Sequence, residues 1–189
     1  MTELLTGEDW YRHFRTFERT ARRLETRDAY AKADEDAAFR RFLDGQAEDP
    51  QYGVELEDWT VEVVGVAVAA GKRFARVRVV REPPTDYQRF GLRNARYNVT
   101  AGEDIRYLER GRAIQLGLPD YDFWLFDEAR LALMHFTDDD RMLGVQIVTA
   151  PAIVRQHAGW LDVAMAAATP HAAYVVADPT RALPPGSEA

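Results

Sequence analysis

The spacing of apolar residues changes along the chain from a helical repeat to an alternating one. Through residues 6–30 they recur at intervals of three and four, which predicts one amphipathic helix. The residues of this apolar face are Trp10, Phe14, Phe17, Ala21 and Leu24. Further helices are predicted over residues 34–45 and 57–71, the second with Trp59 turned inward and a glycine at its end.

From residue 73 apolar residues recur at every second position. The segment "RFARVRVVRE" alternates apolar residues with arginines, as a strand does, and a helix is predicted after it. Further strands are expected at 104–110, 122–128, 131–137 and 145–149, followed by a helix over 149–169. This order predicts an α/β protein with a mixed sheet of about five strands flanked by helices.

The predicted elements fit one α/β domain over residues 1–170. Within it, residues 8–45 form an N-terminal helical segment, and residues 57–168 form the sheet and its covering helices. The proline- and glycine-rich residues 178–189 are expected to be a disordered tail.

Charge and composition narrow the classes of protein. The net charge of -7 argues against direct nucleic-acid binding, although a local basic patch remains open. The first residues lack the basic and apolar regions of a signal peptide, and the longest apolar run, residues 63–70, is too short for a membrane span. We therefore expect a cytoplasmic protein that does not bind membranes.

Several chemistries lack the residues they need. There is no cysteine, and the one serine, Ser187, lies in the expected tail, which excludes thiol and serine nucleophiles. No nucleotide-binding glycine motif follows a strand. The four histidines show no metal-binding spacing. We predict no catalytic residue, no metal and no cofactor.

The stretch "DFWLFDEARLALMHF", residues 122–136, combines acids and a histidine with apolar residues. As two strands it is apolar on both faces, which is typical of strands buried between helices. Its polar residues fall at strand ends, where they either form turns or line a ligand pocket. The candidates for a pocket are Asp122, Trp124, Asp127 and His135, together with Tyr87 and Asn98 from the arginine- and aromatic-rich residues 85–98.

A second candidate surface is the arginine-rich face of the first predicted helix. It consists of Arg12, Arg15, Arg19 and Arg22. Such a face binds an acidic partner, or it is simply solvated and paired with the interspersed Glu18 and Glu25.

Two family resemblances extend this picture. The segments "RLETRDAY", "RVRVVREPPTDYQRF", "NVTAGEDIRYL", "DFWLFDEARLALMHF" and "GWLDVA" are similar to an uncharacterised actinobacterial family, a domain of unknown function. Members of that family are often encoded beside helix-turn-helix regulators, which implies a regulatory setting.

The order of elements from residue 69 to residue 164 also resembles one half of the phospholipase D superfamily. That fold uses a His-x-Lys pair, with histidine attacking phosphorus, and Asp127 falls near the aspartate of its motif. No histidine here is followed by lysine two residues later. The resemblance therefore implies a degenerate, non-catalytic scaffold.

Together these observations favour a non-catalytic regulatory or protein-interaction domain that acts with a helix-turn-helix regulator. The alternative is a small-ligand sensor, or an enzyme that uses Asp and His at the strand ends on a phosphorylated or nucleotide-like ligand. A homodimer is left open.

Overall fold

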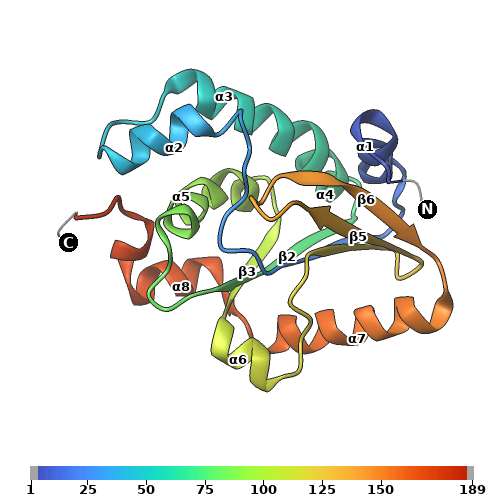
Figure 1. Cartoon of the computed structure of the whole chain (residues 1–189). Helices are drawn as coiled ribbons and strands as arrows, with labels where there is room; N and C mark the ends of the chain where they lie inside the picture. The colour runs from blue at the N-terminus through green and yellow to red at the C-terminus, as the bar shows by residue number, and fades with distance from the viewer. Residues whose placement is uncertain (1–3, 187–189) are drawn as a thin grey trace.

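A computed structural model describes residues 4–186, apart from the side chains of residues 58 and 59. Helices and strands alternate along most of the chain (Figure 1). The strands are β1 (Thr20–Glu25), β2 (Arg73–Val80), β3 (Asp104–Glu109), β4 (Phe123–Phe126), β5 (Arg130–Phe136), β6 (Met142–Val148) and β7 (Thr169–Pro170). The helices are α1 (Gly7–Thr16), α2 (Asp36–Leu43), α3 (Pro50–Trp59), the π-helix η1 (Thr60–Gly65), α4 (Val66–Ala69), α5 (Asp86–Thr100), α6 (Arg110–Gln115), α7 (Pro151–Ala167), α8 (His171–Ala177) and the 3-10 turn η2 (Pro179–Ala182).

The strands form one mixed sheet in the order β6-β5-β4-β1-β2-β3-β7. β1, β2 and β3 run parallel, as the crossovers through helices require, and β4, β5 and β6 form an antiparallel meander beside β1. The predicted α/β class with a mixed sheet is confirmed. The sheet has seven strands and not five, because β1 and the short β7 were not predicted.

Helices cover both faces of this sheet (Figure 1). Alternate side chains such as Val77, Leu125 and Leu131 pack with Leu161 of α7 on one face. On the other face, α1 contributes Trp10 and Phe14 to a cluster with Phe74, Trp124 and Phe126, and η1 and α4 complete it. The division of "DFWLFDE" into two apolar faces is confirmed.

The predicted helix over residues 6–30 is wrong in its second half. The helix α1 ends at Thr16, and the chain then enters the middle of the sheet as β1. The turn between them is fixed by Asp127, whose carboxylate accepts backbone N–H groups of Glu18 (2.9 Å), Arg19 (2.7 Å) and Thr20 (3.0 Å). Because Asp127 lies far along the chain, nothing in the local sequence shows that the helix must stop here.

Local signals define the ends of two other helices. The Thr85 side chain and Gln88 form a reciprocal capping box that starts α5. Gly71 follows α4 with φ +78°, a conformation that suits glycine, and it ends the predicted third helix. The side chain of Trp59, expected to face inward, lies outside the described residues.

Part of the expected tail is ordered. The turn η2 is preceded by Asp178, whose side chain accepts the N–H of Thr180 at 3.0 Å. Arg181 then donates to Glu82 at 2.8 Å and lies over the Tyr174 ring. These contacts hold residues 178–182 against the domain, so the prediction of disorder is wrong for them; residues 187–189 lie outside the described part.

Candidate functional site

A cavity of about 420 Å³ opens on the sheet face that carries α1, α3 and α5. Its floor is formed by side chains of β1, β2, β3 and β4, and its walls come from the three helices. The segment that links β1 to α2, residues 26–35, borders it as well. The cavity lies between elements that are far apart in the sequence.

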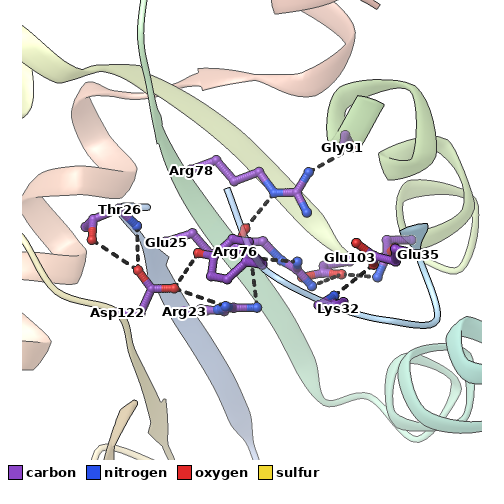
Figure 2. A network of polar contacts seen from close by, with 12 residues as sticks. Arg23, Glu25, Thr26, Lys32, Glu35, Arg76, Arg78, Gly91, Glu103 and Asp122 are labelled. Atoms are coloured by element: carbon purple, nitrogen blue, oxygen red, sulfur yellow. Dashed lines mark hydrogen bonds and ion pairs between the residues drawn. The ribbon is translucent and has the colours of Figure 1, made fainter. Parts of the chain in front are cut away.

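Four charged residues on two neighbouring strands make the charged part of the floor. Arg23 lies opposite Arg76, and Glu25 lies opposite Arg78, in the parallel register of β1 and β2. Because residues two apart in a strand share a face, all four side chains point to the cavity side of the sheet. Figure 2 shows them joined in one network.

Glu25 is the centre of this network. Its Oε1 pairs with Arg23 at 2.7 Å and with Arg76 at 3.3 Å, and its Oε2 accepts from Nε of Arg78 at 2.5 Å. Only 6% of the Glu25 side chain is exposed. One buried carboxylate therefore neutralises parts of three guanidinium groups.

Two further carboxylates extend the network outward. Glu103 binds Arg76 through both oxygens, at 2.8 Å and 3.2 Å, and also accepts from the Asn98 amide at 2.7 Å. Asp122 accepts from Arg23 at 3.1 Å. Both carboxylates are fully buried, so the charges are held in place by each other and not by water.

The arginines fix the ionisation state of Glu25. Burial raises the pKa of a carboxylate, but Arg23, Arg78 and Arg76 outweigh burial here and hold the pKa of Glu25 far below its usual range. A pKa this low keeps Glu25 negative throughout the neutral range. It therefore cannot exchange protons with a substrate at neutral pH.

We expect this network to make the protein sensitive to acid. Since the pKa of Glu25 is lowered on folding, its contribution to stability is complete above the unfolded pKa and is lost as pH falls below about 4. Urea unfolding of the wild type and of Glu25→Gln at a series of pH values tests this. The gap between their free energies of unfolding should narrow as the pH falls from about 6 to about 3. A gap that stays constant would contradict it.

Aromatic rings form much of the cavity wall. Tyr52 of α3 and Tyr87 of α5 lie 6.1 Å and 6.2 Å from the Phe90 ring, and Tyr30 lies 6.1 Å from Tyr87. At the floor, Trp124 lies within cation-π distance of Arg23 and Arg76. The walls thus offer flat apolar surfaces next to fixed charges.

The segment 26–35 crosses the cavity edge and is tied at both ends. Tyr30 donates to Asp122, which also accepts the backbone N–H of Thr26 at 2.8 Å. Near its other end Glu35 accepts from the Tyr87 hydroxyl at 2.6 Å and pairs with Lys32 at 2.8 Å. Burial and the neighbouring carboxylates raise the pKa of both tyrosines, so they remain neutral donors.

The structure places the predicted pocket residues in different surroundings. Tyr87, Asn98 and Trp124 all line the cavity. Asp122 is buried behind Arg23, where it orients the guanidinium and the 26–35 segment.

Asp127 and His135 lie elsewhere. Asp127 follows the opposite end of β4 from Asp122 and binds the turn between α1 and β1. His135 points away from the cavity, because it alternates with Met134, which lines it. The expected grouping of Asp122, Asp127 and His135 in one acid–base site is therefore wrong.

The predicted arginine face is also divided. Arg12 and Arg15 are exposed on α1 and pair with Asp9 and Glu8 of the same helix. Arg19 precedes β1 and is exposed. Arg22 lies within the sheet, where it pairs with Asp162 at 2.5 Å and Glu128 at 3.1 Å. The four arginines do not share one face, since the helix that would align them ends at Thr16.

Sequence reasoning missed the charged floor. A signal was present in "RFARVRVV", where Arg76 and Arg78 alternate with apolar residues on a strand that is buried on both sides. Among the described residues, no group of three His, Asp or Glu side chains is arranged to hold a metal ion. Nor does any described helix have the length and apolar character needed to cross a membrane.

The comparison with known protein families gives a match over nearly the whole length of this fold. A family model described as a domain of unknown function, DUF6879, matches residues 8–176. The chain belongs to the DUF6879 family. The match spans the sheet, the cavity and every residue of the charged floor. No curated protein matches the chain.

Proposed function

We propose that this DUF6879 domain binds a small organic ligand in the cavity and serves a regulatory role without catalysis. The observation that carries the proposal is the floor of four charged side chains, held rigid by ion pairs beneath aromatic walls. A site whose charges are already oriented loses little entropy when a ligand binds.

The size and lining of the cavity support binding. About 420 Å³ falls within the range of about 300–1,000 Å³ that is usual for small-molecule sites. The lining combines apolar and aromatic surface with charged and amide groups, among them Arg78, Asn94 and Asn98. This mixture is typical of sites that select a ligand by shape and a small number of hydrogen bonds.

The same lining supports a role without catalysis. Among the described residues that line the cavity there is no serine, threonine, cysteine or histidine. Glu25, the buried carboxylate of the cavity floor, is held ionised and fully paired. The resemblance to a phospholipase D half that lacks His-x-Lys supports the same interpretation.

In this proposal a partner protein distinguishes the ligand-bound domain from the free one. The chain resembles a family whose members are often encoded beside helix-turn-helix regulators, so we propose such a regulator as the partner. The exposed Arg12, Arg15 and Arg19 near α1 are the proposed contact residues, and α1 also places Trp10 in the cavity wall. A ligand that contacts Trp10 can therefore shift α1 and the exposed arginines near it.

Filling the cavity tests the proposal. Leu56 of α3 lines the cavity, and Val54 of the same helix is 49% exposed and does not. We expect Leu56→Trp to weaken binding of small aromatic probes (naphthoate, naphthamide and naphthyl phosphate) by about tenfold or more, since the larger ring occupies their space. Binding is measured by titration calorimetry.

Val54→Trp is the matched control and should bind the probes as the wild type does. Equal binding by the wild type and Leu56→Trp would contradict the proposal, provided that circular dichroism shows both to be folded.

A further inference from the structure

The geometry points to a ligand that carries a carboxylate group, bound by the guanidinium of Arg78 beside the aromatic wall of the cavity. This inference rests on the proposed function and names the chemical class of its ligand. It follows from how the three arginines of the floor differ.

Arg78 is the least neutralised of the three arginines. Arg23 and Arg76 each have a second, fully buried carboxylate, Asp122 and Glu103 respectively. Among the described residues Arg78 forms an ion pair only with Glu25, and its other hydrogen bonds go to uncharged groups, the carbonyl of Gly91 at 2.8 Å and the hydroxyl of Tyr107. Arg78 therefore stabilises an additional anion more than Arg23 or Arg76 does.

Arg78 is also the most accessible. Its side chain is 23% exposed, against 12% for Arg23 and 10% for Arg76. Figure 2 shows its guanidinium beyond the end of the Glu25 side chain, facing Gly91 of α5. Since Arg78 lines the cavity, this exposed part is within reach of a bound molecule.

Gly91 keeps the surroundings of this guanidinium open. A Cβ atom at Gly91 would lie 3.2 Å from Nη1 of Arg78, closer than side chains normally approach. Glycine in the middle of a helix costs about 1 kcal/mol relative to alanine. Its presence in α5 is explained by the close approach of Arg78 to the helix backbone.

Aromatic groups next to Arg78 define the rest of the ligand site. Tyr107 is a hydrogen-bond partner of Arg78, and burial raises its pKa to about 12, so its hydroxyl stays protonated. Tyr87 and Phe90 line the same cavity from α5. A flat ring attached to the carboxylate can therefore pack on these side chains while the carboxylate meets the guanidinium.

The floor favours a carboxylate over a phosphate. The fork of an arginine matches the two oxygens of a carboxylate, and one incompletely neutralised guanidinium suits one negative charge. A phosphate dianion needs several cationic donors that are not already neutralised, and the other described cations of the lining, Arg23, Arg27, Lys32 and Arg76, are each paired with a carboxylate. It would also be repelled more strongly by Glu25, which shares Arg78.

Titration calorimetry with naphthoate, naphthamide and naphthyl phosphate tests this class. We expect the wild type to bind naphthoate about tenfold more tightly than either of the other two. Arg78→Lys keeps a positive charge for Glu25 but loses the planar fork, and Arg78→Met loses both. In each variant the preference for naphthoate should disappear while naphthamide binding is kept.

Arg73→Met is the control, because Arg73 lies on the same strand, is half-exposed and does not line the cavity. It should keep the preference. Equal affinities in the wild type, a preference for the phosphate, or a preference that survives in both Arg78 variants would overturn the carboxylate assignment but leave the binding proposal. A failure of all three probes to bind at millimolar concentration would overturn both.

Discussion

Replacing Glu25 by glutamine should lower the free energy of unfolding by about 3–5 kcal/mol. The substitution preserves size but removes the one carboxylate that Arg23, Arg76 and Arg78 share. The three guanidinium groups then face one another with less negative charge between them. Chemical denaturation monitored by tryptophan fluorescence measures the loss.

Glu8→Gln is a suitable comparison, because Glu8 pairs with Arg15 on the surface of α1 and both side chains are mostly exposed. Exposed pairs contribute less than about 1 kcal/mol, so this variant should resemble the wild type. A similar small loss for Glu25→Gln would mean that the buried network does not hold the floor of the cavity together.

Asp122→Asn should have an effect of similar size, about 3–5 kcal/mol, since it also breaks a buried ion pair. The carboxylate accepts from Arg23, from Tyr30, and from both the backbone and the side chain of Thr26. An amide cannot accept all of these, and its own N–H groups meet other donors. The expected consequence is a loosened 26–35 segment as well as lower stability.

Hydrogen exchange distinguishes this effect from general unfolding. The backbone amide of Thr26, bound to Asp122, should exchange faster in Asp122→Asn under native conditions. The amides of α7 on the opposite face should be unaffected by local loosening. Asp120→Asn, an exposed position two residues earlier, should change neither quantity. Unchanged exchange at Thr26 would show that Asp122 does not anchor the segment.

The strands from β2 to β6 could be predicted because each has a local signal. Alternation of apolar residues marks β2, and continuous apolar character marks β4 and β5. The central strand β1 has neither signal. Its buried positions include Arg22 and Glu25, which are stable there only because residues far along the chain neutralise them.

The candidate site, like the fold, could be predicted only in part. Tyr87, Asn98 and Trp124 were identified because aromatic and amide side chains on predicted elements are visible in the sequence. The floor was not, since Arg23 and Glu25 were assigned to a helix. Strand register brings Arg23 to Arg76 and Glu25 to Arg78, and register cannot be read before β1 is known to be a strand.

The most direct test of ligand binding in this cavity uses the indole N–H signals of the tryptophans in a two-dimensional NMR titration with naphthoate. Trp10 and Trp124 line the cavity, whereas Trp160 lies on α7 beneath the other face of the sheet. Binding in the cavity predicts saturable shifts of the Trp10 and Trp124 signals while that of Trp160 stays in place. A saturable shift of Trp160 with Trp10 and Trp124 unmoved would contradict the account.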